Sequence, residues 1–321
     1  MRAPGRAGQP KVSSMKAIRI HEFGGPEVLR VEDLPMPHPG PGEVLIKVEA
    51  SSVNPVDYKM RNGGYIPADK LPLVLGRDVA GTVDQTGAGV DSFKVHDQVF
   101  VMLARDRGGY AEYVAAKADD CAAMPQSLDF VQAAAVPLAA LTAWQGLFDH
   151  GELKPGQTVL IHGASGGVGH FAVQFAKAIG ARVLATASGQ DRAFLQKLGA
   201  DVAIDYQAER FEDVAHDLDL VFDLVGGETQ DRSWAVLKDG GAMISTLQAP
   251  DKAKAAEKHA RTAHYMAEPN GGELAEIARL IDQGRVKPCI ARTFPLDQAA
   301  EAERQLEHEH VRGKIVLEVR R

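Results

Sequence analysis

The sequence predicts an α/β protein of two domains, and three observations lead to this class. Short strands separated by glycine and proline turns follow one another from Met15 to about Ala118. Strands and helices then alternate from Thr158 to about Thr246, which is the pattern of parallel βαβ units. The length of 321 residues suits about two domains, each with its own hydrophobic core. We therefore expect a β-rich domain beside a doubly wound parallel sheet.

Composition and charge exclude several classes of function. The hydrophobic share of 45% and the charged share of 25% are ordinary for a soluble globular protein. No apolar run approaches the roughly 18 residues needed to span a bilayer, so we expect no membrane partner. The net charge of −7 opposes binding to the phosphates of nucleic acids. Cys121 and Cys289 are the only cysteines, which excludes a disulfide framework and suits a reducing, cytoplasmic location.

Residues 1–14 differ in composition from the rest of the chain. They carry three basic residues among proline, glycine and serine, and they lack the apolar core of a secretory signal. We interpret them as a flexible extension or a segment left by cloning. A short organelle transit peptide stays open as the alternative.

The first domain consists of strands and turns. The candidate strands are Lys16–Ile20, Val44–Glu49, Val79–Asp84, Gln98–Leu103 and Ala111–Val114. A polar insertion, residues 54–63, interrupts them, and we expect it to be too polar and turn-prone to enter the core.

The second domain alternates between strands and helices. The predicted strands are Thr158–Ile161, Arg182–Ala187, Val202–Asp205, Leu218–Leu224 and Ala242–Thr246. Helices are predicted near Phe130–Ala135, Leu138–His150, Phe171–Ile179, Asp191–Leu198, Phe211–Ala215 and Thr229–Leu237. The chain then continues with amphipathic helices at Glu273–Asp282 and Leu296–Glu307 and a strand at Lys314–Val319. We expect the last forty or so residues to rejoin the first domain.

The segment Thr158–Gly180 carries the strongest motif. A short apolar strand is followed by Ala164-x-Gly166-x-x-Gly169 and then by a helix with one apolar stripe. Small residues let the backbone turn tightly and let a pyrophosphate approach the open N–H groups of the helix start. A glycine turn alone could be only a turn, but strand, turn and helix together predict a dinucleotide site.

Motifs in order along the chain resemble the medium-chain dehydrogenase/reductase superfamily, and within it the zinc-independent quinone oxidoreductase branch. This branch includes the zeta-crystallin-like and plant enone oxidoreductases. The motifs are "MKAIRIHEFGGPEVLRVEDLP", "ASSVNPVDYKMRNG", "LPLVLGRDVAGTV", "GGYAEYV", "AAAVPLAALTAWQGL", "VLIHGASGGVGHFAVQFAKAIGARV", "LGADVAIDY" and "GKIVLEV". The resemblance implies a GroES-like catalytic domain, residues 15–137 and 268–321, and a Rossmann cofactor domain, residues 138–267.

The resemblance also predicts that no metal takes part. Asn54, Arg77 and a position near Leu138 stand where zinc-bearing relatives have their ligands. An amide, a guanidinium and an alkyl chain cannot form the N/S site of a catalytic zinc. His308 and His310 are better explained as a solvated helix end than as a metal site.

The cofactor predicted from the second Rossmann strand is NADPH. NAD-binding domains usually end this strand, about 20 residues past the glycines, with Asp or Glu. Here the strand ends in Ser188, with Arg192 four residues on, and the resemblance implies that Ser188, Arg192 and Tyr206 contact the 2′-phosphate. Two alternatives stay open. Ser188 and Asp191 could form a capping box, or Asp191 could reach the 2′-OH of NAD.

The resemblance supplies the other site residues. Asn54, Lys59 and Tyr65 are the candidate catalytic residues, beside the nicotinamide. The candidate cofactor contacts are Pro55, Lys59, Thr142, Ser165, Gly166, Gly167, Val168, Ser188, Arg192, Tyr206, Leu224, Val225, Thr246, Leu247 and Arg312. Alternatively, Lys59 and Tyr65 are ordinary loop residues, Lys59 only binds a cofactor phosphate, and Thr142 is a helix-start hydroxyl.

The expected activity is reduction of quinones or α,β-unsaturated carbonyl compounds, because a cation or phenol beside the nicotinamide would stabilise the oxygen that gains negative charge. The alternatives are a zinc-free alcohol or aldehyde oxidoreductase and a non-enzymatic NADPH-binding protein of the crystallin type. Arg77 and Asp78 are expected to form a structural salt bridge, and His162 a satisfied neutral side chain. The resemblance further implies a homodimer.

Overall fold

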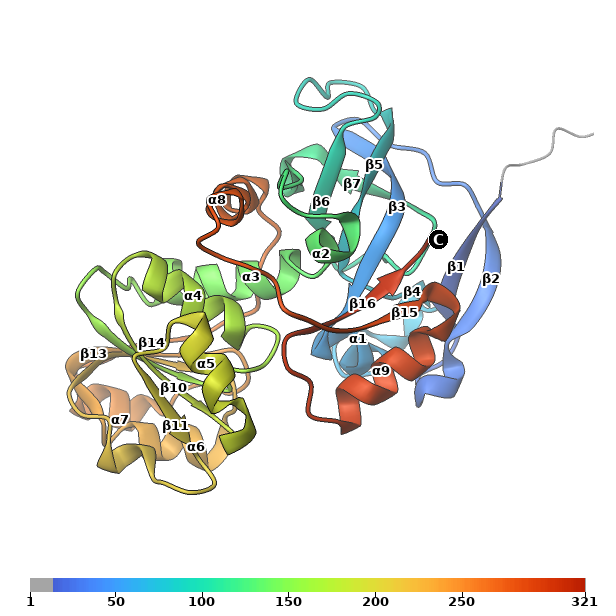
Figure 1. Cartoon of the computed structure of the whole chain (residues 1–321). Helices are drawn as coiled ribbons and strands as arrows, with labels where there is room; N and C mark the ends of the chain where they lie inside the picture. The colour runs from blue at the N-terminus through green and yellow to red at the C-terminus, as the bar shows by residue number, and fades with distance from the viewer. Residues whose placement is uncertain (1–13, 321) are drawn as a thin grey trace, which may run out of the picture.

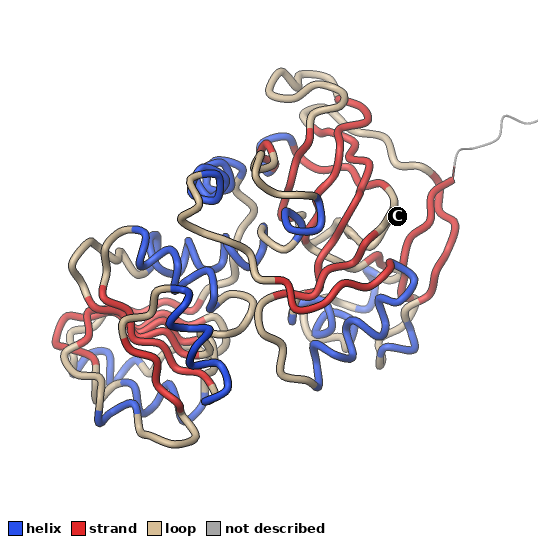
Figure 2. The backbone as a smooth tube through the Cα atoms, in the orientation of Figure 1, coloured by secondary structure: helices blue, strands red, loops and turns tan. Residues whose placement is uncertain are grey.

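Two domains lie side by side in the computed structural model, which describes residues 14–320 (Figure 1). Residues 1–13 of the expected extension lie outside the described residues, and Ser14 already belongs to the first strand. Each domain has its own sheets, with helices packed against them (Figure 2). The predicted α/β class, with a β-rich domain and a parallel-sheet domain, is confirmed.

The cofactor domain is built on a six-stranded sheet in the order β11-β10-β9-β12-β13-β14, with every pair parallel. Its strands are β9 Thr158–His162, β10 Arg182–Ala187, β11 Val202–Asp205, β12 Leu218–Asp223, β13 Leu237–Ser245 and β14 Arg261–His264. The strand order reverses at β9. Ligands of such sheets bind beyond the carboxyl ends of the strands at this switch point.

The middle of strand β9 is apolar because both of its faces are buried. Val159 and Ile161 belong to the same core cluster as Phe171 of the following helix, whereas Leu160 belongs to the cluster on the opposite face. The helices of this domain are α4 Gly169–Ala178, α5 Arg192–Leu198, α6 Gly227–Ser233 and α7 Lys252–Glu257. The prediction of a helix up to Leu237 was wrong, because Leu237 begins β13. The predicted helix near Phe211 is a single 3₁₀ turn, Phe211–Asp213.

The β-rich domain holds a seven-stranded sheet and a three-stranded sheet. The larger sheet has the order β15-β16-β3-β5-β6-β8, with β7 also paired to β3, and the smaller sheet has the order β2-β1-β4. The strands are β1 Ser14–Ile20, β2 Arg30–Pro35, β3 Glu43–Val53, β4 Leu73–Val74, β5 Asp78–Thr86, β6 Gln98–Met102, β7 Tyr113–Lys117, β8 Cys121–Ala123, β15 Ile290–Pro295 and β16 Lys314–Glu318. The C-terminal segment returns to this domain, since β16 pairs antiparallel with β3.

Five further helices cover this domain and join it to the cofactor sheet. They are α1 Pro55–Arg61, α2 Phe130–Ala134, α3 Pro137–Trp144, α8 Gly271–Asp282 and α9 Ala299–His308. Helix α3 lies where the domains meet and contacts both α4 and α8 (Figure 1). It continues into a π-helical turn, Gln145–His150.

The expectation that residues 54–63 stay out of the core was wrong. They form α1, and its Asp57, Met60 and Arg61 are buried. The local sequence starts a helix, because Pro55 occupies the first turn and the Asp57 carboxylate accepts the backbone N–H of Asn54 at 2.8 Å. The Arg61 guanidinium is tolerated inside because Glu303 of α9 lies 2.6 Å away.

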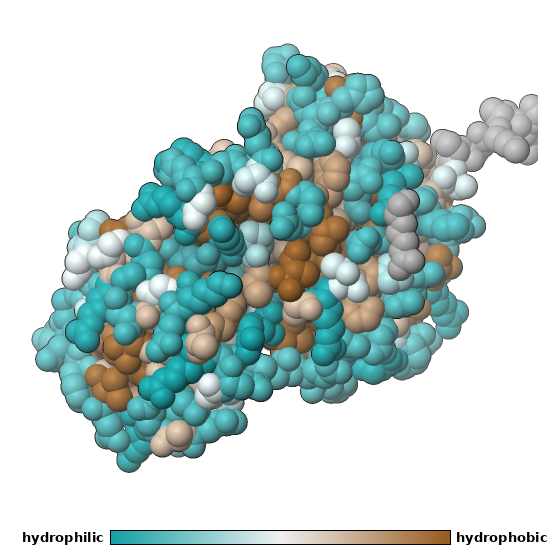
Figure 3. All heavy atoms as spheres, viewed as in Figure 1, coloured by the Kyte–Doolittle hydropathy of each residue, from teal (hydrophilic) through white to brown (hydrophobic). Residues whose placement is uncertain are grey.

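Figure 3 shows apolar side chains gathered where the two domains adjoin, while polar side chains cover most of the rest of that face. None of the helices formed by residues 14–320 combines the length and the apolar character that a membrane crossing requires.

Candidate active site

A cavity of about 290 Å³ lies between the two domains, and we call it the chamber. Its walls come from α1, from α3, from the glycine turn after β9 and from the ends of β12 and β13. The predicted site residues that line it are Pro55, Lys59, Tyr65, Thr142, Gly166, Gly167, Val168, Leu224, Thr246 and Leu247. Segments far apart in sequence thus meet at the switch point of the parallel sheet.

A second cavity, of about 440 Å³, continues along the carboxyl edge of the sheet, and we call it the outer cavity. It shares Gly163 and Gly166 with the chamber, so the two cavities adjoin at the glycine turn. The predicted residues Ser165, Ser188, Tyr206 and Val225 line the outer cavity. A long cleft that narrows over a glycine turn suits a dinucleotide, with one nucleoside on each side of its pyrophosphate.

The glycine turn has the backbone that a pyrophosphate needs. Gly163 has φ +69°, a conformation that side chains other than glycine rarely adopt. A Cβ at Gly169 would lie 2.3 Å from the Gly163 carbonyl oxygen, so only glycine lets α4 start this close to the turn. A Cβ at Gly166 would meet only that carbonyl, at 3.5 Å, and the space it would fill is the cleft itself. The turn therefore fits a dinucleotide cofactor.

No carboxylate ends β10. Its last residue is Ala187, Ser188 follows, and both line the outer cavity. Glu209 lines the outer cavity, where it lies 3.5 Å from Arg192.

Asp191, four residues past the end of β10, is fully buried and already engaged. Its carboxylate accepts hydrogen bonds from Arg312 at 2.5 and 2.8 Å and from His310 at 2.6 Å. Although burial favours the neutral acid, the bonds from Ser165, Arg312 and His310 lower the pKa of Asp191.

These contacts correct two expectations, for Ser188 and His310, and show the surroundings of two predicted cofactor contacts, Arg312 and Arg192. Ser188 caps no backbone N–H, and its hydroxyl donates to Asp191 at 3.3 Å instead of forming a capping box. His310 is not a solvated helix end, since it joins the two domains through Asp191. Arg312, predicted to contact the cofactor, is paired with the same carboxylate. Arg192 lies next to the outer cavity, 3.5 Å from Glu209, with 55% of its side chain exposed.

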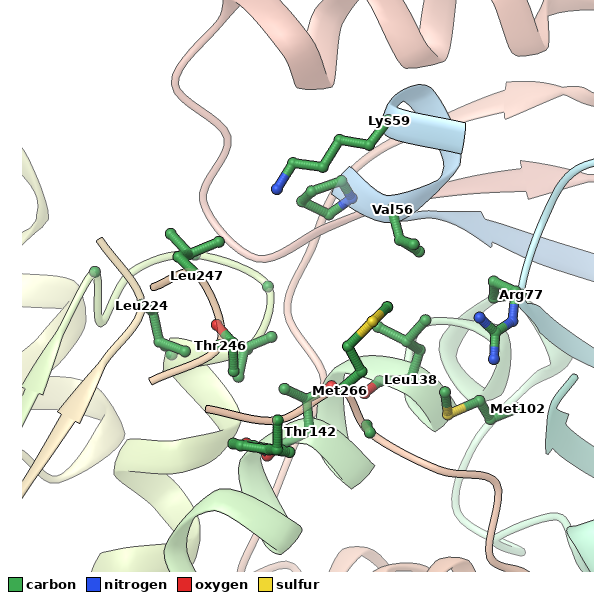
Figure 4. Close-up of a pocket in the computed structure, with 18 of the residues that line it drawn as sticks. Val56, Lys59, Arg77, Met102, Leu138, Thr142, Leu224, Thr246, Leu247 and Met266 are labelled. Carbon is green, nitrogen blue, oxygen red and sulfur yellow. Dashed lines mark hydrogen bonds between the residues drawn. The ribbon is translucent and has the colours of Figure 1, made fainter. Parts of the chain in front are cut away.

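Lys59 and Tyr65 reach the chamber from α1 and the loop after it. Lys59 forms no ion pair with any residue between 14 and 320, and Tyr65 is 48% exposed at the mouth. Figure 4 shows Lys59 above the chamber and Leu224, Thr246 and Leu247 along the side formed by the cofactor domain. Thr142 lies within α3, where its hydroxyl donates to Leu138 O at 2.7 Å, so the helix-start alternative was wrong.

Behind the chamber lies a buried ionic cluster that the sequence did not reveal. The Lys314 ammonium donates to Val53 O at 3.1 Å and to the side-chain oxygen of Asn54, and it lies 3.5 Å from Asp78. Burial lowers the pKa of Lys314, and Asp78 opposes this effect. Asn54 is therefore engaged at both ends, since its amide also donates to Asp78 at 2.8 Å, and it does not line the chamber.

The only signal for this cluster was a lysine at the start of an apolar strand. Such a charge needs a partner when it is buried, but the sequence does not say which one. The structure also corrects the salt bridge expected between Arg77 and Asp78. Arg77 Nε donates to Leu103 O at 2.7 Å, while Asp78 pairs with Lys314.

His162 behaves as expected. Its ring nitrogens each lie 2.9 Å from a hydroxyl oxygen, those of Thr186 and Ser233, and burial lowers its pKa to about 4. The ring is therefore neutral at physiological pH. Within residues 14–320, no group of three or more His, Cys, Asp or Glu side chains is placed to hold a metal ion.

Family comparisons agree with this architecture. Residues 40–126 match the alcohol dehydrogenase GroES-like domain, and residues 198–317 match the zinc-binding dehydrogenase family. The chain is 37% identical to NAD(P)H oxidoreductase RTN4IP1, mitochondrial, from Mus musculus, covering 95% of this chain and 89% of the relative. It is 35% identical to the chloroplastic NADPH-dependent alkenal/one oxidoreductase of Arabidopsis thaliana, covering 94% of this chain and 79% of the relative.

A solved structure shows the same fold over almost the whole chain. The quinone oxidoreductase from Coxiella burnetii superposes with a TM-score of 0.89 at 39% identity, covering 96% of this chain and 100% of that one. The similarity extends over both domains. The chain is therefore an oxidoreductase of the medium-chain dehydrogenase/reductase superfamily and belongs to its quinone oxidoreductase-like group.

Proposed function

We propose that this protein is an NADPH-dependent, zinc-independent reductase of quinones or α,β-unsaturated carbonyl compounds. One observation carries the proposal. A cleft suited to a dinucleotide opens at the glycine turn into a mostly apolar chamber that Lys59 and Tyr65 enter. The names of the Arabidopsis and Coxiella relatives, which refer to alkenals, enones and quinones, support this class of substrate.

The choice of NADPH rests on the ribose end of the cleft. The outer cavity has small hydroxyl and aromatic side chains, Ser188 and Tyr206, where an NAD-binding domain usually has a free acid. Asp191 cannot readily bind a ribose hydroxyl, because Arg312 and His310 occupy its carboxylate. The exposed guanidinium of Arg192 is close enough to this edge to bind a 2′-phosphate.

When bound, NADPH supplies a hydride, that is two electrons, to the double bond or quinone ring and is released as NADP⁺. The protein has to stabilise the charge that this transfer leaves on the substrate oxygen. The ammonium of Lys59, which has no ion-pair partner among residues 14–320, can do so within a mostly apolar chamber. One proton then completes the reduced product, and the Tyr65 phenol at the mouth can donate it and regain it from solvent.

Zinc independence is argued from the side chains themselves. Asn54 and Arg77 are engaged by Lys314, Asp78 and Leu103, and Leu138 offers an alkyl chain. Zinc in a catalytic site takes three nitrogen, sulfur or carboxylate ligands, which these residues do not supply.

The test is the consumption of NADPH and NADH by the purified protein with a panel of quinones and enones. We expect NADPH to be oxidised with members of at least one class, one molecule for each two-electron reduction, and NADH to be a poorer donor. Binding of NADPH without reduction of any acceptor would contradict the proposal and favour a non-enzymatic NADPH-binding protein. Oxidation of simple alcohols with NADP⁺, without enone or quinone reduction, would favour an alcohol oxidoreductase.

A further inference from the structure

The wall of the chamber opposite the cofactor domain contains a buried guanidinium. Arg77, with 3% of its surface exposed, lines the chamber beside Met102 and Leu138. Figure 4 shows it across the chamber from Leu224, Thr246 and Leu247, while Lys59 enters from a separate wall. Arg77 thus places a positive charge at the end of the chamber formed by the β-rich domain.

Most of the hydrogen-bonding capacity of this guanidinium is unused. Arg77 Nε donates to Leu103 O at 2.7 Å, and within residues 14–320 the two terminal nitrogens have neither a hydrogen-bond acceptor nor an ion-pair partner. Four N–H groups therefore remain. Burial lowers the pKa of Arg77, but arginine stays protonated in proteins, so the charge is retained.

The nearby acids are committed to other partners. Asp78 accepts bonds from Ser52 and Asn54 and pairs with Lys314. Asp57 accepts the backbone N–H of Asn54 and the hydroxyl of Tyr110 through Oδ2, while its Oδ1 has no hydrogen-bond partner among residues 14–320. The charge of Asp57 acts on Arg77, but the two side chains form no ion pair.

Glu268 completes the set of nearby acids. It is largely exposed and lies 3.6 Å from Arg105. None of these acids neutralises Arg77 directly.

The rest of this end of the chamber is apolar. Val56, Met102, Leu138 and Met266 surround the space that the guanidinium faces. A buried charge without a partner is costly, and a guanidinium fork matches a carboxylate through two parallel N–H···O bonds. A ligand with an anionic group and an apolar body would pair with the guanidinium of Arg77 and pack against the apolar side chains around it.

We propose that Arg77 binds a carboxylate on the substrate, so that the chamber selects unsaturated ketones or quinones whose reducible group is joined through an apolar body to a carboxylate. This inference rests on the proposed reductase function and specifies its substrate class. The two cations then have separate tasks. Arg77 holds the carboxylate at the far wall, and Lys59 faces the oxygen of the reducible group.

A matched pair of substrates tests the proposal, namely (E)-8-oxonon-6-enoate, an enone joined through four methylene groups to a carboxylate, and its methyl ester, which lacks the negative charge. The quantity compared is the acid-to-ester ratio of kcat/KM, measured in the wild type and in each variant. The acid and the ester differ in intrinsic reactivity by the same factor in every variant, so this factor cancels when the ratios are compared. In Arg77→Met the ratio should fall at least about tenfold, mainly through a higher KM for the acid. Arg77→Lys should retain part of the preference, and the control Arg105→Met, outside the chamber, should leave the ratio unchanged.

A second measurement does not depend on the folding of a variant. The saturated analogue 8-oxononanoate and its methyl ester lack the double bond that accepts hydride, so their inhibition of the wild-type enzyme reports binding alone. We expect the acid to inhibit at least about tenfold more strongly than the ester. Equal inhibition by both, or an unchanged acid-to-ester ratio in a folded Arg77→Met, would overturn the proposal. That result would leave reduction of neutral quinones and enones intact, whereas failure of the reductase function would abolish NADPH consumption with every acceptor.

Discussion

The two arginines near the ribose end of the cofactor cleft differ in whether a carboxylate already neutralises their charge. Two of the three guanidinium nitrogens of Arg312 donate to the buried Asp191, so its charge helps to hold the two domains together. Arg192 has only Glu209, 3.5 Å away, and remains largely exposed. An exposed and weakly paired guanidinium can turn to a new anion at little cost. Arg192 is therefore the residue we expect to distinguish NADPH from NADH.

The first prediction is that Arg192→Ala weakens NADPH binding and spares NADH. A charge-assisted bond to phosphate contributes about 1.5–3 kcal/mol, so the preference for NADPH should fall roughly ten- to a hundredfold. The measurement is kcat/KM for each cofactor at saturating acceptor. Arg182→Ala is the matched control, because this exposed arginine begins β10 at the opposite end of the strand. Equal loss with both cofactors would mean that Arg192 supports the fold.

The second prediction concerns Lys59. An enone that accepts hydride becomes an enolate with a localised oxyanion, whereas a quinone spreads the charge over an aromatising ring. Lys59→Met should therefore lower kcat about tenfold or more on an enone, with a smaller loss on a simple benzoquinone. Steady-state kinetics with both acceptors would measure this difference. A raised KM for NADPH with equal losses on both acceptors would place Lys59 in the cofactor site instead.

The sequence allowed some site residues to be named and concealed others for a physical reason. Lys59, Tyr65 and the glycine turn lie in local motifs, so a resemblance could place them. The Lys314–Asp78 pair and the Arg312–Asp191 pair join residues distant in sequence, and their partners exist only after folding. The resemblance places Arg77 where zinc-bearing relatives have a metal ligand. Only the folded structure shows that its terminal nitrogens face the chamber without a hydrogen-bond partner among residues 14–320.

At the scale of elements, α1 and α9 are joined by a buried arginine. Arg61 donates to Glu303 at 2.6 Å, to Glu307 at 2.8 Å and to Gly24 O at 3.1 Å. Burial raises the pKa of Glu303 to about 8, and the charge of Arg61 opposes the shift. This contact fixes α1, the helix that carries Lys59 to the chamber.

The third prediction is a pH-dependent loss of stability in Arg61→Met. Without Arg61, the pKa of Glu303 rises further, so the folded state holds its proton while the unfolded state releases it above about 4.5. Below about pH 8 Glu303 keeps its proton in both folded proteins, so stability relative to wild type should fall only as pH rises from about 8 to 10, by up to about 1.4 kcal/mol for each pH unit. Urea unfolding across this range measures it. In Arg61→Met/Glu303→Gln the added pH dependence should disappear, and its persistence would refute the explanation.

The predicted elements succeeded where burial was complete. The inner strands β9, β10 and β12 are apolar on both faces, and their predicted bounds agree with the structure within a residue. Strands β2, β4, β8, β14 and β15 were missed. Strands β4, β8 and β14 have only two to four residues, and β2 and β15 have no buried residue, so neither group shows an apolar pattern. Helix α1 was missed because its polar residues are buried through contacts with α9, which no local pattern records.

At the scale of the whole molecule, β14 forms one edge of the cofactor sheet. An edge strand leaves backbone N–H and C=O groups available for another chain. The fourth prediction is a homodimer joined at this edge. Sedimentation equilibrium should give twice the chain mass of 34.4 kDa, and Thr262→Pro should shift the protein toward monomer. Thr262→Ala, which keeps the backbone N–H, is the control, and a wild-type monomer would refute the prediction.

The claim of a zinc-independent NADPH reductase is tested most directly by the rate of NADPH oxidation after exhaustive chelation, with metal content measured on the same sample. Because Asn54, Arg77 and Leu138 supply no zinc site, the chelated protein should keep its full rate of quinone or enone reduction and contain no stoichiometric metal. One zinc per chain, lost together with the activity and restored with it, would contradict the account.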